Sequence, residues 1–106
     1  MDIRKALARS LRLARRAQGL VQEDFSNVSG RTYLSEVERG VKSPTLEKID
    51  ELARVMKVHP LTVIALAYTS NLQGRDVEAI LSRVRTEAET LLSKAEELQP
   101  EKARRR

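Results

Sequence analysis

The chain has 106 residues and a net charge of +5, with 20 Lys and Arg against 15 Asp and Glu, and no cysteine. This length fits one domain with one appended element, and the lack of cysteine excludes disulfides, thiolate catalysis and cysteine metal sites. Apolar residues make up 41% of the chain but aromatic residues only 3%, which favours an all-α fold with an aliphatic core. Because no apolar run is long enough to span a membrane or to act as a secretory signal, we expect a cytoplasmic protein.

The first predicted helix spans residues 3–18 and ends at Gly19. Its apolar positions recur every three or four residues, as on one face of a helix: Ile3, Leu7, Leu11 and Ala14. Residues 1–20 also hold six Lys and Arg against one Asp, and most of these bases fall on the opposite face. This basic face indicates contact with a polyanion, and a solvated surface is the alternative. The candidate contact residues are Arg9, Arg12 and Arg16.

Two short helices are expected next, over residues 21–27 and 31–39, and the stretch between them is rich in turn-forming Asn, Ser and Gly. Their expected inward-facing residues are Phe25, Val28, Val37 and either Tyr33 or Leu34. Two short helices joined by a tight turn are typical of a helix-turn-helix, in which the second helix enters the major groove of DNA. A plain α-hairpin inside a helical bundle is the alternative.

A fourth helix is expected over residues 45–57, with Thr45 as its N-cap. A fifth begins at His59 and Pro60 and runs to residue 68, because proline is favoured at the first helical position. This helix is nearly all apolar, so we expect it to be buried. Its apolar residues include Leu61, Ile64, Ala65 and Leu66. Five helices with short connections predict a compact domain over residues 1–68.

Residues 69–74 are expected to be a linker, residues 75–99 a long helix and residues 100–106 a basic tail. The apolar residues of the long helix are spaced alternately by four and three, as in a coiled coil. They are Val77, Leu81, Val84, Ala88, Leu91, Ala95 and Leu98. This stripe must either fold back on the domain or pair with a second chain. Because the domain is complete without it, we favour dimerisation across a two-fold axis.

Three stretches of the sequence resemble a known family. They are GLVQEDF (19–25), TYLSEVERG (32–40) and SPTLEKIDELARVMKVHPLTVIALA (43–67). In these motifs the chain is similar to the lambda-repressor-like, or Xre/Cro-type, helix-turn-helix proteins. The resemblance implies a five-helix DNA-binding domain, with the second and third helices contacting double-stranded DNA.

The resemblance also implies roles for single residues. Eight positions match those through which the family contacts DNA: Gln22, Arg31, Thr32, Ser35, Glu36, Arg39, Lys42 and Ser43. We include Tyr33 with them, although it can equally pack inward. Glu38 matches a glutamate that pairs with an arginine of the first helix, and Arg15 stands where that partner is expected. We interpret Arg15 and Glu38 as a structural ion pair, and two solvated charges are the alternative.

The sequence departs from the family pattern at two places. Val21 stands where the family has a capping Ser or Thr, a loss of roughly 1 kcal/mol. The interval from Gln22 to Glu38 is two residues shorter than the family spacing, so either Ser29 or Gly30 caps the third helix.

The functional hypothesis is a sequence-specific transcriptional regulator, in the simplest form a repressor that binds a pseudo-palindromic operator as a homodimer. The alternative is an antitoxin or protein-interaction module whose C-terminal helix binds a protein partner. We expect no enzyme activity, cofactor or metal, because no nucleophile, carboxylate pair or ligand set can be assigned. The one histidine, His59, is expected to be a helix cap or a surface residue.

Overall fold

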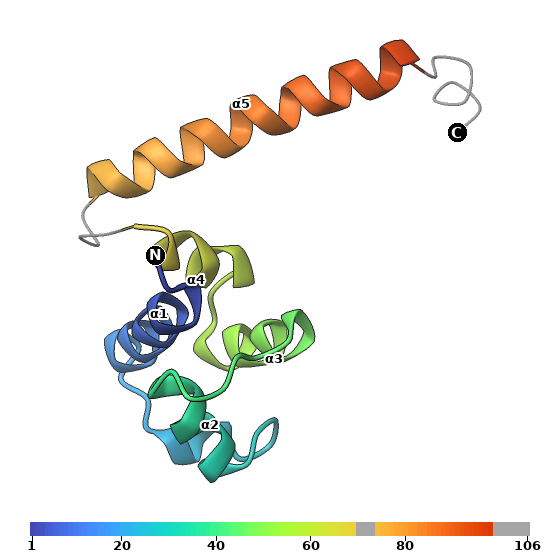
Figure 1. Ribbon diagram of the computed structural model, residues 1–106. Helices are drawn as coiled ribbons and strands as arrows, with labels where there is room; N and C mark the ends of the chain where they lie inside the picture. The colour runs from blue at the N-terminus through green and yellow to red at the C-terminus, as the bar shows by residue number, and fades with distance from the viewer. Residues whose placement is uncertain (70–73, 99–106) are drawn as a thin grey trace.

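The computed structural model describes residues 1–69 and 74–98, and every regular element in these ranges is helical. The elements are α1 (Ile3–Ala17), η1 (Gln22–Phe25), α2 (Arg31–Glu38), α3 (Leu46–Met56), α4 (Pro60–Ala67) and α5 (Gly74–Leu98). This order confirms the predicted fold, which is an all-α domain of five short helices followed by one long helix. Figure 1 shows the five short elements gathered below α5.

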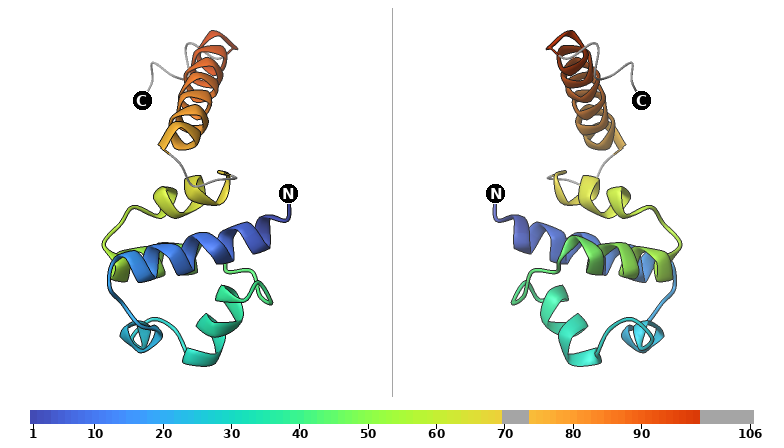
Figure 2. Two further views of the ribbon diagram at one scale, coloured as in Figure 1. Left: turned by 90° about the vertical axis from the view of Figure 1, so that its left-hand side faces the viewer. Right: turned by 90° about the vertical axis from the view of Figure 1, so that its right-hand side faces the viewer.

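The core lies where α1 meets α2 and α4, with η1 and α3 closing its sides. The largest fully buried side chains come from all five short elements: Leu11, Phe25, Val37, Leu52, Met56 and Val63. Ser10 is also fully buried, and its hydroxyl donates a hydrogen bond of 2.6 Å to the carbonyl of Val63. Since α1 packs against both α2 and α4, it positions these two helices relative to each other (Figure 2).

Side-chain caps explain where three helices begin. The carboxylate of Asp2 accepts hydrogen bonds from the first turn of α1, and the hydroxyl of Thr45 accepts one of 3.1 Å from the amide of Lys48. His59 caps α4, since its Nδ1 accepts a hydrogen bond of 3.0 Å from the amide of Leu61. Such caps satisfy backbone donors that have no partner within the helix. The predicted capping roles of Thr45 and His59 are thus confirmed.

The second helix is shorter than predicted. It is one 3-10 turn, η1, rather than a helix over residues 21–27. The amides of Val28 and Ser29 both donate to the carbonyl of Phe25, each at 2.9 Å, so the chain turns directly after η1. With Gly30 as the N-cap of α2, only a few residues remain to connect the two helices, and a longer helix has no room.

The prediction that α4 is buried was wrong. Only its Val63 and Ala67 are buried, whereas Leu61 and the C-cap residue Tyr68 are 63% and 51% exposed. One face of α4 packs on α1, and the other faces α5, which leaves it partly open. An apolar composition indicates that a helix has apolar side chains on more than one face. It does not indicate whether other elements of the same chain pack against each of these faces.

The long helix α5 contributes no residue to the core. Its coiled-coil stripe, which we call the α5 seam, comprises Val77, Leu81, Val84, Ala88, Leu91, Ala95 and Leu98. Exposure along this stripe rises from 50% at Leu81 to 81% at Leu98. The C-terminal half of α5 extends beyond the domain (Figure 1). Accordingly, the radius of gyration is 16.9 Å, whereas a compact chain of this length has one of about 13 Å.

The predicted linker and tail fall largely outside the described residues, which omit 70–73 and 99–106. Thr69, at the start of that linker, is buried, and its hydroxyl donates a hydrogen bond of 2.8 Å to the carbonyl of Leu66. No described helix is long and apolar enough to cross a lipid bilayer.

Candidate nucleic-acid interface

Helix α2 has one buried face and one open face. Leu34 and Val37 belong to the core, and Glu38 is buried beside them. Because an α-helix repeats every 3.6 residues, burial of these positions leaves the intervening polar residues outside. We call these residues the α2 polar face: Arg31, Thr32, Ser35, Glu36 and Arg39. Arg31, Thr32 and Arg39 are exposed, and Ser35 and Glu36 are half-buried.

The α2 polar face lies at the end of the domain that is remote from α5. Figure 1 places α2 and η1 at the bottom of the molecule and α5 at the top, and both side views in Figure 2 agree. The long helix therefore does not cover the candidate site. A straight polymer such as a DNA duplex can approach α2 without meeting α5.

Two ion pairs, one of them exposed, hold basic side chains at α2 and in the loop after it. The guanidinium of Arg31 lies 3.1 Å from the carboxylate of Glu23 in η1, and the ammonium of Lys42 lies 3.3 Å from that of Glu36. Arg31 and Glu23 are 75% and 55% exposed, and exposed pairs of this kind contribute little to stability. Arg31 can therefore exchange this carboxylate for another anion at small cost.

Tyr33 and Lys42 lie together at the edge of the α2 polar face. Tyr33 is half-buried against the core, and the Lys42 ammonium is 5.9 Å from the centre of its ring. The ring of Tyr33 thus packs inward and also lies beneath a basic side chain, and its contact with DNA stays a prediction. Ser43 is exposed on the same loop.

A glycine sets the direction of this loop. Gly40 has a φ of +77°, in the left-handed region that favours glycine, and its amide donates to the carbonyl of Val37 at 3.1 Å. A β-carbon at this position would lie 3.5 Å from Cγ of Lys5 and 4.0 Å from Cβ of Ala8. The end of α2 thus rests closely on α1, so the loop that holds Lys42 and Ser43 leaves α2 in a defined direction.

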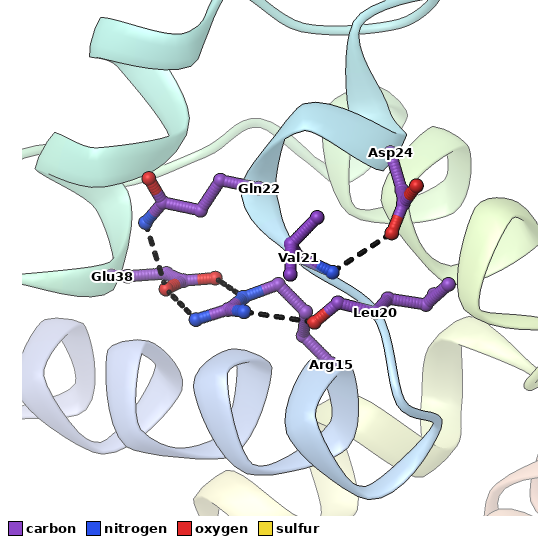
Figure 3. Close-up of polar contacts among 6 residues, drawn as sticks. All are labelled: Arg15, Leu20, Val21, Gln22, Asp24 and Glu38. Carbon is purple, nitrogen blue, oxygen red and sulfur yellow. Dashed lines mark hydrogen bonds and ion pairs between the residues drawn. The ribbon is translucent and has the colours of Figure 1, made fainter.

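Arg15, Glu38 and Gln22 form a buried network behind α2 (Figure 3). Arg15 donates to both carboxylate oxygens of Glu38, from Nε at 2.6 Å and from Nη2 at 2.9 Å, and donates from Nη1 to the carbonyl of Leu20 at 2.9 Å. The side-chain amide of Gln22 donates to Oε1 of Glu38 at 3.1 Å. This network joins α1, η1 and α2 through a single carboxylate.

The electrostatics of this network favour its charged form. Glu38 is 4% exposed and Arg15 is 11% exposed, so the two charges are largely removed from water. The hydrogen bond to Glu38 raises the pKa of Arg15 above its ordinary value, against the opposing effect of burial. A two-pronged arginine–carboxylate pair also fixes geometry. The Arg15–Glu38 pair therefore sets the angle between α1 and the end of α2.

The missing cap at Val21 is partly replaced. Val21 offers no side-chain acceptor to η1, but its own amide donates to Oδ2 of Asp24 at 2.8 Å (Figure 3). This bond is half of a capping box, which in its complete form also has a Ser or Thr accepting from the third residue of the helix. At the start of α2, the N-cap is Gly30 rather than Ser29.

The basic residues of α1 do not act alike. Arg9 is half-buried and donates from Nη2 to the carbonyl of Thr69 at 2.7 Å, so it secures the segment after α4. Arg12 is half-buried and Arg16 is exposed. One nitrogen of the Arg9 guanidinium is thus bonded within the domain, and contact of Arg9, Arg12 or Arg16 with phosphate stays a prediction.

Lys48 has a role that the sequence did not indicate. Its ammonium donates to the carbonyl of Val28 at 2.5 Å and pairs with Glu51 at 2.9 Å. The Lys48–Glu51 spacing of three residues is visible in the sequence. The bond to Val28 depends on how α3 packs against the turn, so no sequence signal could have found it. Lys48 thereby supports the turn between η1 and α2.

Within residues 1–69 and 74–98, no group of three or more His, Cys, Asp or Glu could hold a metal ion. The described site is therefore one of exposed basic, hydroxyl and amide groups on a short helix held by a rigid scaffold. Such groups bind phosphates and the edges of bases. The fold and this arrangement define a helix-turn-helix domain, with η1 and α2 as the two helices of the motif.

Comparison with known proteins agrees with this class. A family described as "Helix-turn-helix" matches residues 11–63. The uncharacterized HTH-type transcriptional regulator y4dJ of Sinorhizobium fredii is 36% identical over 66 residues, which cover 60% of this chain and 86% of the relative. The control protein C.SmaI of Serratia marcescens is 33% identical over 76 residues, which cover 70% of this chain and 90% of the relative. No solved structure matches the chain significantly.

The chain belongs to the lambda-repressor-like, Xre-type helix-turn-helix family, as its motifs predicted. It is a DNA-binding transcriptional regulator, and its family is not a class of enzymes.

Proposed function

We propose that the protein is a homodimeric repressor that binds a pseudo-palindromic operator through α2 and pairs through α5. In this proposal residues 1–68 form the DNA-binding domain, residues 69–74 the linker, residues 75–99 the dimerisation helix and residues 100–106 a basic tail. The observation that carries the proposal is the position of the α2 polar face. It is open to solvent, it lies away from α5, and a buried ion pair holds the helix beneath it.

The α2 polar face supplies the groups that recognise bases. In the proposed complex Arg31 and Thr32 enter the major groove first, since the N-terminal residues of a recognition helix contact base edges. Arginine pairs with guanine. A hydroxyl such as that of Ser35 can donate a hydrogen bond to a base edge or accept one from it. Glu36 accepts from the amino group of cytosine in the same way. These residues would determine the operator sequence.

Residues around α2 would position the protein on the DNA backbone. Arg39, Lys42 and Ser43 lie at the end of α2 and in the loop after it, where all three are exposed. Contacts of this kind fix register without sequence information. Tyr33 would lie against the same strand beside Lys42. Gln22 would contribute its second amide hydrogen, because Glu38 accepts only one of the two.

The α5 seam supports the homodimer. This seam is a continuous apolar stripe along α5, which is 25 residues long, and no residue of α5 is buried within the single chain. Two-fold pairing through the same surface on both chains would cover it. It would also present two α2 helices to two half-sites of one operator, which requires an operator of matching symmetry.

Selection of bound duplexes from a random DNA pool tests this function. The full-length protein is expected to enrich an inverted repeat whose half-sites are about one helical turn apart, or a multiple of it. Enrichment of a single half-site would contradict the dimer, and no enrichment at all would contradict sequence-specific binding. Because phosphate contacts depend on salt, the selection is repeated at two salt concentrations.

Repression is tested separately on the selected operator. With the operator placed across a promoter in a purified transcription reaction, added protein is expected to lower transcript yield. The same promoter with a scrambled operator serves as the control. A rise in yield that depends on the operator would show an activator instead.

A further inference from the structure

We propose that the two α5 helices of the homodimer pair in antiparallel orientation, with the C-terminal half of each beside the N-terminal half of the other. This inference rests on the proposed homodimer and specifies the direction and register of its interface. The inference is based on the size of the side chains in the α5 seam, on the charges beside the seam, and on the open face of α4 next to the first half of α5. Each of these three observations favours the same alignment of residues 81–98 of one chain with residues 98–81 of the other.

The first observation is the alternation of large and small residues in the α5 seam. In a parallel pair each residue meets its own copy, so Ala88 and Ala95 each face an alanine and leave two thin layers. In the antiparallel register Ala88 faces the partner's Leu91, Ala95 faces the partner's Val84, and Leu81 faces the partner's Leu98. Every alanine then lies opposite a larger side chain, and layers of more even volume pack with fewer voids.

The second observation is the charge beside the seam. Glu87 and Lys94 flank it on the same side, one heptad apart, and residues at such flanking positions set the orientation of coiled coils. In the antiparallel register Glu87 faces the partner's Lys94, and two-fold symmetry forms this pair twice. In a parallel pair Glu87 faces the partner's Leu92 instead. A shift by one heptad brings Glu87 against the partner's Glu87, or Lys94 against the partner's Lys94, so charge also selects the register.

The third observation is the open face of α4. A hollow of about 380 Å³ lies between α4 and the first half of α5. Its apolar lining comes from both sides: Leu61, Ile64 and the C-cap residue Tyr68 of α4, and Ile80, Leu81 and Val84 of α5. Antiparallel pairing places the partner's Leu98 and Ala95 beside Leu81 and Val84, at the rim of this hollow. The most exposed end of the α5 seam thereby reaches the partly open apolar face of α4.

Exchange of charge between two variants tests the register. Glu87→Lys alone places lysines opposite each other in both flanking pairs, and Lys94→Glu alone places glutamates there. Each variant is expected to have a dimer dissociation constant about tenfold above that of the wild type, as loss of two exposed pairs predicts. An equimolar mixture of the two variants restores both pairs and is expected to associate with wild-type affinity in sedimentation equilibrium.

Glu89→Lys is the matched control. Glu89 has an arginine four residues before it, as Glu87 has Arg83 at 3.2 Å, but it lies away from the seam. Glu89→Lys is therefore expected to leave the dissociation constant unchanged, and circular dichroism verifies that every variant stays helical. A mixture that associates no more tightly than its components overturns the antiparallel register while leaving the homodimer intact. A wild-type chain that stays monomeric overturns both.

A distance measurement tests the direction independently. Because the chain has no cysteine, Ala79→Cys provides one spin-label site per chain, on the outer side of α5. In the antiparallel register the two labelled positions are 21 residues apart along the helix axis, or about 32 Å. In a parallel pair the backbones at this outer position are separated by the distance between helix axes plus a helix radius on each side, about 15 Å. The shorter separation would exclude the proposed direction.

Discussion

Glu38 is the residue on which the site depends most. Its carboxylate accepts hydrogen bonds from Arg15 in α1 and from Gln22 in η1, and Glu38 is itself the last residue of α2. Resemblance to a family predicted the partner Arg15, because that pair follows from matched positions. The bond from Gln22 was not predictable, because it depends on how closely η1 approaches α2. Gln22 thus both braces the motif and, in our proposal, contacts DNA.

Arg15→Ala is expected to reduce the free energy of unfolding by about 3 kcal/mol, because it leaves the buried charge of Glu38 without its main partner. Urea denaturation followed by circular dichroism measures this loss. Arg54→Ala is the control, since Arg54 is 78% exposed in its pair with Asp50 and should contribute less than about 1 kcal/mol. Equal effects of the two substitutions would refute the structural importance assigned to the Arg15–Glu38 pair.

At the scale of elements, helical periodicity and capping chemistry predicted most of the fold. The bounds of α1, α3, α4 and α5 differ from the predicted ranges by at most one residue at each end, and the caps at Thr45 and His59 follow from residue type. The two errors have a common physical origin. The length of η1 and the exposure of α4 are decided by neighbours that are distant in sequence, and a local pattern contains no information on how those neighbours pack.

Val21→Thr is expected to stabilise η1 by up to about 1 kcal/mol, because a threonine hydroxyl can share the amide of Asp24, which donates to the carbonyl of Val21 at 3.1 Å, and complete the capping box. Val21 is 53% exposed, so little apolar burial is lost in the exchange. Thermal unfolding measures the change. Val21→Ala is the comparison, since it shortens the side chain without adding an acceptor. If threonine and alanine gave the same stability, the missing cap would not be the cause.

At the scale of the whole molecule, the buried core and the α5 seam are separate. Every residue of the core lies within residues 6–67, whereas α5 adds none. The domain therefore has the means to fold without α5, and the apolar stripe of α5 touches α4 only at its N-terminal half and is nowhere buried within the described chain. This division favours a molecule in which one part recognises DNA and the other determines how many recognition helices act together.

A chain that ends after Asn71 is expected to remain folded and to be monomeric, because it keeps the core and loses the α5 seam. Sedimentation gives its mass and circular dichroism its fold. On a complete operator it should bind at least tenfold more weakly than the full chain, since only one half-site is held at a time. If the shortened chain still sedimented as a dimer, the interface would lie in the domain and not in α5.

The most direct test of the central claim is the operator affinity and base preference of Arg31→Ala, measured on the selected operator and on its single-base variants. If the α2 polar face recognises bases, this substitution weakens binding by about 1–3 kcal/mol and relaxes the preference at one position in each half-site. Arg54→Ala, on the exposed side of α3, should change neither quantity. If Arg31→Ala leaves affinity and base preference at wild-type values while the helix content is unchanged, the recognition surface does not lie at the start of α2.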